Sequence, residues 1–330
     1  MKQLEQVPLE DSVDRDYRPE EGVKVSFVCR SNHEVVKREG IEIESSTLGK
    51  YRIKPDEGFK SIDHAATIGS SGNESRWDYV ILCAIILPDL VDDPAFLSPL
   101  LKIPDTDRHP PTLVLIQNGV GFEDNLRRRH PKVPILSAVT IVNAEQLGPG
   151  LIRHNHWTRI KIHSHSQLEL LAKLLRDGNI NDAEIYGERD LQILRWRKLA
   201  INASMNPTSI LSGGLQSTDM VKEGEPRVHL EGCVTEVFEA AKVIFGIDSF
   251  PSHFASIERI LKSTEKAGQR SIIKPSMLVD WELGRPLEIG AISIMGIPIQ
   301  VAARAGIKLS RIQSMYAFLT QLRPALIKPR

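Results

Sequence analysis

The chain has 330 residues, too many for one average domain, because single hydrophobic cores usually stop growing near about 250 to 300 residues. Hydrophobic residues make up 41% and charged residues 25% of it, as in an ordinary globular protein with a buried core. Lysine plus arginine and aspartate plus glutamate balance at 42 each, which removes the broad basic field that nucleic-acid and membrane binding normally use.

The N-terminal segment, residues 1–22, is charged, lacks the apolar run of a secretory signal, and is left unassigned. The apolar run that starts at Val80 is too short to span a bilayer and is typical of a buried strand. Cys29, Cys83 and Cys233 form no CxxC pair, so neither a disulfide framework nor a thiolate zinc site is indicated. We therefore expect a cytoplasmic protein without membrane or nucleic-acid partners.

Strand-like and helix-like runs alternate in residues 23–188. The runs VKVSFVC, YVILCAII, TLVLIQ and PILSAVTIV are typical of strands buried on both faces, which predicts a mostly parallel, Rossmann-like α/β sheet. Between the strand-like runs LIRHNHWTRIKIH and DAEIYGE lies a helical pattern, SQLELLAKLLRDG, whose last residue, Gly178, is expected to cap the helix.

Long amphipathic patterns dominate residues 189–330, and few strand signals occur there. One example is HLEGCVTEVFEAAKVIFG, in which Gly246 stands where a helix cap belongs. We therefore predict an all-helical second domain.

The segment LVLIQNGVG runs from a buried strand into Gly119 and Gly121, and a helix-like stretch, FEDNLRRRH, follows. Glycines at such a turn let a ligand approach the backbone, where Asn118 could bind a sugar or carbonyl group. By itself the pattern favours an ordinary turn.

The segment VSFVCRSN places Arg30 and Ser31 at the end of the expected second strand of a dinucleotide-binding fold. An acidic residue there would bind the ribose hydroxyls of NAD, whereas arginine suits the 2′-phosphate of NADP. This position favours NADP(H), and the alternative is a solvated surface arginine.

In WRKLAINASMNP, Lys198, Asn202 and Asn206 recur every four residues, so a helix would carry them on nearly one line. That line is either a wet edge or a site. Further on, Ser276 precedes Glu288 by twelve residues, and Glu288 follows Pro286, where a carboxylate would also stabilise the start of a helix.

Histidines recur in two pairs, His154 with His156 and His163 with His165. A two-residue interval points both rings of a pair to the same face of a strand. Because no carboxylate or third histidine stands at ligand spacing, a solvated strand face is favoured over a metal site.

Four motifs in the right order give the chain a resemblance to the ketopantoate reductases (2-dehydropantoate 2-reductases). They are QNGVG, the GPGLIRH turn after AVTIV, WRKLAINASMNP and SMLVDWELGRPLEIG. The resemblance implies an NADP-binding Rossmann domain and a helical substrate or dimerisation domain, with an active site in the cleft between them. The domain boundary would lie near residue 188.

By motif, the resemblance also implies roles for individual residues. Lys198 matches the catalytic lysine and Glu288 the substrate-binding glutamate. Substrate contacts are implied for Asn202, Asn206, Ser276 and Asn118, and cofactor contacts for Arg30, Ser31, Asn118, Gly119 and Gly121.

The sequence departs from the family pattern in two places. Residues 1–21 contain no glycine, so the first strand and its G-x-G-x-x-G phosphate turn are not recognisable, and Ala84, Ile85 and Ile86 stand where a lysine near the cofactor is common. Either the chain lacks its true start or it has diverged.

We expect an NADPH-dependent reductase of a 2-oxo acid, with Lys198 as general acid and a possible homodimer through the helical domain. One alternative is a non-catalytic remnant that binds a ligand or dimerises. Another is a reductase of the same architecture with a different 2-oxo or 3-oxo acid as substrate.

Overall fold

A computed structural model describes most of the chain, in stretches separated by gaps. They are residues 15–17, 22–29, 31–70, 77–84, 93–102, 110–163, 168–180, 182–252, 254–268, 274–285, 287 and 294–326. The chain divides into two compact units, a smaller one made of residues 1–77 with 141–159 and a larger one made of residues 78–140 with 160–330. This division differs from the expected boundary near residue 188, which stays a prediction.

The smaller unit contains two groups of paired strands and two helices. In the first group, β1 (Arg15–Tyr17) pairs in parallel with β4 (Gly49–Ile53), β4 pairs antiparallel with β3 (Ile41–Ser45), and β3 pairs in parallel with the start of β9 (Leu151–His163). In the second, β2 (Ser26–Val28) pairs in parallel with β5 (Glu57–Phe59). The helices are α1 (His33–Glu39) and α2 (Ile62–Ser70).

The larger unit begins with a mixed sheet whose first three strands are parallel. Its strands β6 (Tyr79–Leu82), β7 (Thr112–Ile116) and β8 (Ile135–Gly148) pair in that order, β9 lies beside β8, and β10 (Ala183–Tyr186) pairs in parallel with β9. Leu113, Val114 and Leu115 are completely buried. Consecutive residues of a strand face opposite sides, so β7 is covered on both faces, as its continuous apolar run predicts.

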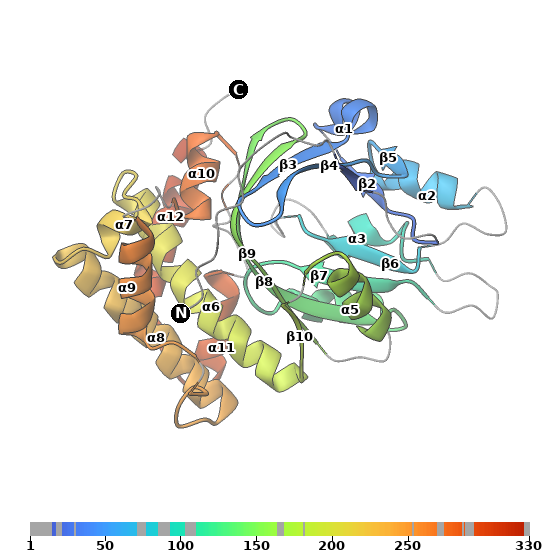
Figure 1. Cartoon of the computed structure of the whole chain (residues 1–330). Coiled ribbons are helices and arrows are strands. Elements are labelled where there is room, and N and C mark those ends of the chain that lie inside the picture. Colours follow the sequence, from blue (N-terminus) through green and yellow to red (C-terminus); the bar gives the residue numbers. More distant parts are fainter. Residues whose placement is uncertain are drawn as a thin grey trace, which may run out of the picture. The chain divides into compact units, whose positions relative to one another are not determined.

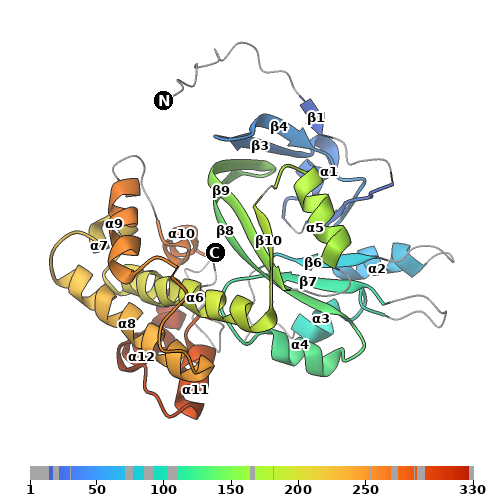
Figure 2. The same ribbon diagram turned by 60° about the horizontal axis from the view of Figure 1, so that its bottom comes forward.

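Three helices alternate with these strands along the chain. They are α3 (Asp93–Leu97), α4 (Glu123–Arg129) and α5 (Leu168–Asp177). Figure 2 shows α3 and α4 side by side, in agreement with their contacts. The expected cap at Gly178 is wrong in one respect, because the left-handed residue after α5 is Asn179, with φ at 63°. Asparagine is the common substitute for glycine in that conformation.

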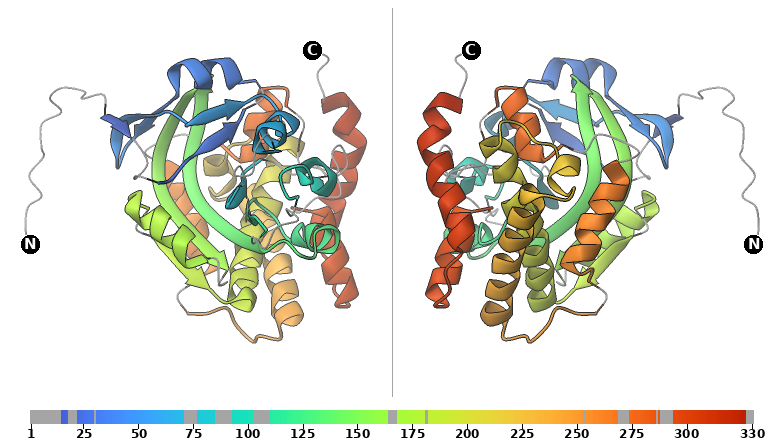
Figure 3. Two further views of the ribbon diagram at one scale, coloured as in Figure 1. Left: turned by 90° about the vertical axis from the view of Figure 1, so that its right-hand side faces the viewer. Right: turned by 90° about the vertical axis from the view of Figure 1, so that its left-hand side faces the viewer.

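Helices make up the rest of the larger unit within its described residues. They are α6 (Glu188–Leu211), α7 (Ser217–Met220), α8 (Glu225–Phe245), α9 (Ile257–Gly268), α10 (Ser276–Glu282), α11 (Gly296–Arg304) and α12 (Ser310–Leu326). Helices α6, α8 and α12 pack against one another (Figures 1 and 3), and their apolar faces form the largest cluster of buried side chains. The cap at Gly246 is confirmed by its left-handed φ of 57°.

Helix α6 is the central helix of this part, and most of its residues are buried. Pro207 stands inside it, and because proline has no N–H, the carbonyl of Ala203 loses its helical donor there. The side chains around Pro207 also bond to the backbone of α6, since the Ser204 hydroxyl donates to Ala200 O at 2.6 Å and the Thr208 hydroxyl to Ser204 O at 2.7 Å. Within the described part of the chain, no helix is both long and apolar enough to cross a bilayer.

Candidate active site

The polar line of α6 becomes more buried along the helix. Lys198 and Asn202 are half-buried, and Asn206 is only 3% exposed. A wet edge would keep its amides in water, and a buried amide needs hydrogen-bond partners. The Asn206 end of the line is therefore part of the interior of the larger unit.

Lys198 reaches from α6 to the edge where the parallel pairing of β7 with β8 stops, after Ile116 and Ala138. We call the residues at this edge, 117–119 after β7 and 137–140 within β8, the strand ends. Its Nζ donates to Oδ1 of Asn118 at 2.8 Å and to the backbone carbonyl of Thr140 at 2.5 Å. Asn118 follows β7 and Thr140 lies in β8. The carboxyl ends of parallel strands are where α/β folds place ligand sites, so the contact joins the lysine to a position suited to chemistry.

Asn206 joins α6 to the first turn of α10. Its Oδ1 accepts hydrogen bonds from the Ser276 hydroxyl at 3.3 Å and from the backbone N–H of Met277 at 3.2 Å. Two residues that the sequence singled out separately, Asn206 and Ser276, thus lie together, and Ser276 remains exposed. Two other candidates, Glu288 and Arg30, lie outside the described residues.

The turn after β7 has the backbone shape that its glycines suggest. Gly119 has a φ of 92° and Gly121 a φ of 74°, which side chains rarely adopt. A Cβ added to Gly121 would lie 2.6 Å from Cγ2 of Ile297 in α11. Gly121 therefore has a packing reason to be glycine, while its expected role near a cofactor stays a prediction.

Sequence reasoning missed Arg195, one turn before Lys198. This side chain is 2% exposed, and its guanidinium donates to four oxygens. They are the carbonyls of Gln117 at 3.0 Å, Gly119 at 3.2 Å and Ala138 at 3.2 Å, and the Ser137 hydroxyl at 2.6 Å. Arg195 therefore bonds to the same two strand ends as Lys198.

Glu123, at the start of α4, is the counter-ion of Arg195. The carboxylate is 4% exposed, lies 3.6 Å from Arg195 Nη2, and accepts a hydrogen bond from Ser137 at 2.6 Å. Burial acts to raise the Glu123 pKa, but the Arg195 charge and hydrogen bonds from Ser137 and Gln192 outweigh it, so the pKa lies below its ordinary value. The buried pair is therefore charged.

The remaining sequence candidates lie elsewhere. Ser31, just before α1 in the smaller unit, is exposed, and Asn202 is half-buried on α6 between Lys198 and Asn206. Of the histidine pairs, His154 bonds through Nδ1 to the Ser45 hydroxyl at 2.8 Å, and His163 Nε2 lies 3.2 Å from a Glu188 oxygen. Among the described side chains, no three histidine, cysteine or carboxylate groups gather as metal ligands would.

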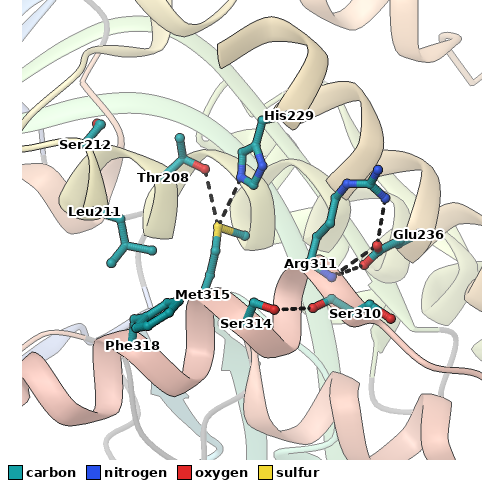
Figure 4. A pocket seen from close by; sticks show the side chains of 10 residues that line it. All are labelled: Thr208, Leu211, Ser212, His229, Glu236, Ser310, Arg311, Ser314, Met315 and Phe318. Atoms are coloured by element: carbon teal, nitrogen blue, oxygen red, sulfur yellow. Dashed lines mark hydrogen bonds and ion pairs between the residues drawn. The ribbon is translucent and has the colours of Figure 1, made fainter. Parts of the chain in front are cut away.

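A separate hollow of about 680 Å³ lies between the C-terminal turn of α6, α8 and α12 (Figure 4). Its charged side chains pair with each other, Arg311 Nη1 with Glu236 Oε1 at 2.9 Å, and His229 Nε2 lies 3.4 Å from the Met315 sulfur. Phe318 at its rim is well exposed. The charged groups of the hollow already pair between neighbouring helices, so it is a weaker candidate than the Lys198 region.

Comparison with known proteins links the whole arrangement to one family. The model described as ketopantoate reductase PanE/ApbA matches residues 19–167, and the model for the C-terminal part of the same family matches residues 190–323. The predicted fold class, α/β followed by helices, is confirmed by solved structures. A crystal structure of 2-dehydropantoate 2-reductase from Methylococcus capsulatus superimposes with a TM-score of 0.74 at 26% identity, covering 92% of this chain and 90% of that chain.

Two curated relatives span nearly the same length. A 2-dehydropantoate 2-reductase from Nostoc sp. is 24% identical over 305 residues, which cover 89% of this chain and 86% of the relative. A Saccharomyces cerevisiae protein described as "Uncharacterized protein YDL144C" is 25% identical over 324 residues, which cover 92% and 87%.

Proposed function

The chain belongs to the ketopantoate reductase PanE/ApbA family, and from this membership we propose that it uses NADPH to reduce a 2-oxo acid of the 2-dehydropantoate type to the 2-hydroxy acid. Relatives named as 2-dehydropantoate 2-reductases support the oxidoreductase class. The observation that carries the proposal is the Lys198 ammonium, held by Asn118 and Thr140 at the strand ends.

Lys198 is suited to the proton-transfer half of this reaction. NADPH, when bound, supplies the hydride to the 2-oxo carbon. The carbonyl oxygen then gains negative charge, which the Lys198 ammonium stabilises and protonates to give the hydroxyl, before the neutral amine regains a proton from water. Two of its acceptors, Asn118 Oδ1 and Thr140 O, are uncharged, so these two hydrogen bonds orient the ammonium without adding a negative charge.

The amides of α6 are suited to holding the substrate. The N–H of Met277 requires an oxygen opposite it, which fixes the Asn206 amide with Oδ1 toward α10 and leaves its NH₂ group as the end that can donate to a ligand. We assign substrate contacts to Asn202, Asn206 and Ser276, with Glu288 as a further ligand for a substrate hydroxyl. Asn118 would contact both substrate and nicotinamide.

The residues fit the two ends of NADPH unequally. At the nicotinamide end, the backbone turn at Gly119 and the amide of Asn118 provide a suitable polar edge next to Lys198. At the phosphate end, residues 1–21 contain no glycine, and Gly22, with φ at 98°, stands alone before β2. Arg30 and Ser31 remain our candidates for the 2′-phosphate.

The unequal fit gives a second candidate function some weight. If no other segment supplies the phosphate turn, the chain could retain the helical region as a ligand-binding or dimerisation module that does not catalyse reduction. The two hydrogen-bonded pairs, Lys198 with Asn118 and Ser276 with Asn206, favour the enzyme, because loss of function would release these polar side chains from selection.

Two measurements on the purified chain separate the two functions. The first is titration with NADPH, and the second follows the oxidation of NADPH in the presence of each of a panel of 2-oxo acids. We expect saturable NADPH binding and turnover with at least one 2-oxo acid. Lys198→Met should lower kcat by about 10²- to 10⁴-fold, the usual contribution of a general acid, and change NADPH affinity little.

The matched control is Lys242→Met, a helical lysine that pairs with Glu239 at 2.8 Å on α8. We expect it to retain both binding and turnover. Equal losses of turnover and of NADPH affinity in Lys198→Met would remove the assigned role, and a folded wild-type chain that binds no NADPH would favour the non-catalytic module.

A further inference from the structure

We propose that Arg195 is a positioning residue for Lys198, because it fixes the two strand ends whose oxygens hold the lysine ammonium. The inference rests on the proposed role of Lys198 in proton transfer. Arg195 would not touch the substrate. It would act through Asn118 and Thr140 and set where the ammonium stands relative to the reacting carbonyl.

Along the turn after β7, the acceptors of Arg195 and of Lys198 alternate from one residue to the next. Arg195 Nη1 takes the carbonyls of Gln117 and Gly119, the residues on either side of Asn118, whose side chain accepts from Lys198. A guanidinium that holds both flanking carbonyls leaves the backbone of the residue between them little freedom to rotate. The Asn118 amide is therefore presented to Lys198 from a fixed base.

A similar arrangement occurs on β8. Arg195 Nη2 takes the carbonyl of Ala138 at 3.2 Å, and Lys198 takes the carbonyl of Thr140, two residues further along the strand. In a strand, the carbonyls of alternate residues point the same way, so both face α6 from one edge of β8. Arg195 thus holds the edge from which Lys198 receives its second bond.

Arg195 can act as a fixed point because its own surroundings are closed. Its guanidinium lies over the Phe122 ring at 4.8 Å, and Glu123, the next residue, is its counter-ion. Ser137 bridges the pair by accepting from Arg195 and donating to Glu123. The turn from Gln117 to Glu123 is therefore held at both ends by one side chain.

The arrangement needs a guanidinium and not just a positive charge. Arginine presents a planar fork of donors that can serve several oxygens at fixed angles, whereas lysine is a flexible point charge with three donors. Arg195→Lys would keep the buried charge beside Glu123 but could not reproduce the bonds to Gln117, Gly119 and Ala138 together. This substitution therefore separates positioning from charge.

Arg197 provides a matched control on the same helix. It is half-buried, donates through Nη2 to Ala255 O at 3.3 Å, and lies over the Phe254 ring at 5.0 Å. Like Arg195 it combines a carbonyl bond with a ring contact, but these contacts are with the segment before α9 and not with the strand ends. Arg197→Lys should cost stability without moving Lys198.

The experiment compares the wild-type chain with Arg195→Lys and Arg197→Lys by two readouts. Steady-state kinetics gives kcat and KM, and acylation of lysine amines, followed by peptide mass spectrometry, gives the labelling rate of Lys198 relative to Lys242. We expect Arg195→Lys to lower kcat by about 10- to 100-fold, as a misplacement of about 1 Å can do. KM should change less than about threefold, and the relative labelling rate of Lys198 should change several-fold. Arg197→Lys should match the wild type in all three.

A second variant guards against misfolding. Removing both charges in Arg195→Met/Glu123→Gln leaves no unpaired buried ion, so this chain should fold even if Arg195→Lys does not. It should show the same fall in kcat and the same change at Lys198. Wild-type kcat and labelling in a folded Arg195 variant would overturn the proposal.

The labelling readout keeps the two proposals distinguishable, because it does not need turnover. If the wild-type chain reduces no 2-oxo acid, the proposed function fails, while an altered labelling rate of Lys198 still shows that Arg195 positions it. If Lys198→Met abolishes turnover and the Arg195 variants behave as wild type, the function stands and the positioning role of Arg195 fails.

Discussion

Gly121→Ala should destabilise the larger unit through a collision with Ile297. Two costs add at this position. A side chain at φ 74° costs about 1–2 kcal/mol, and the new Cβ would stand 2.6 Å from Ile297 Cγ2, an overlap whose relief by backbone shifts typically costs about 1–3 kcal/mol. We expect a loss of about 2–5 kcal/mol in the free energy of unfolding, measured by urea denaturation.

Gly246→Ala separates the two costs. Gly246 also has a positive φ, 57°, but a Cβ there would meet no atom within 4 Å, so only the backbone cost of about 1–2 kcal/mol should appear. Ile297→Ala in the Gly121→Ala background should recover part of the loss as a favourable coupling of about 1–3 kcal/mol. Equal losses in the two glycine variants, with no coupling to Ile297, would refute the packing argument. If Gly121→Ala also abolished nucleotide binding, the position would need glycine for the approach of the cofactor as well.

Three further predictions concern single side chains. Because the Glu123 pKa is lowered in the fold, its contribution to stability is present above about pH 4.5 and is lost as pH falls through the folded-state pKa. Glu123→Gln should therefore be less stable than the wild type by about 3 kcal/mol at pH 7, with a smaller difference at pH 3, in urea titrations at both pH values. Asn206→Ala should cost about 1–3 kcal/mol, since the buried Met277 N–H loses its acceptor, whereas Ser276→Ala should cost less than about 1 kcal/mol in the same assay. Arg30→Ala should reduce the ratio of kcat/KM for NADPH to that for NADH, and an unchanged ratio would indicate a surface arginine.

The sequence predicted best those strands that are buried on both faces of the sheet. In β7 the positions on both faces of the strand are apolar, and its three central residues are fully buried. The prediction of a strand covered on both faces is therefore confirmed. The run VKVSFVC is less regular, and its strand shrinks to Ser26–Val28. At the end of α5, the glycine rule selected Gly178, although Asn179 adopts the left-handed conformation. The sequence shows which residue types tolerate the left-handed backbone conformation. Tertiary packing decides which of the neighbouring residues adopts it.

The candidate site was predictable only in part, because spacing along a helix reveals which residues share a face but not what that face meets. The interval of four placed Lys198 and Asn206 on one line of α6, and the structure gives each a partner from a distant segment, Asn118 for the lysine and Ser276 for the amide. The family motif, and not the spacing, had singled out Asn118 and Ser276 as site residues, but neither predicted these two contacts. Their roles in binding and catalysis stay predictions.

The three cations of RWRK show why Arg195 escaped sequence reasoning. Charged residues are rarely buried, so a basic cluster beside a tryptophan is normally interpreted as a solvated face. A helix turns by about 100° per residue, so Arg195 and Lys198 stand about 60° apart, whereas Arg197 lies about 160° away from Arg195. That rotation alone sends Arg195 and Lys198 to the strand ends and Arg197 to Phe254. The sequence does not reveal the counter-ion of Arg195, because Glu123 is far away along the chain and reaches Arg195 only in the folded structure.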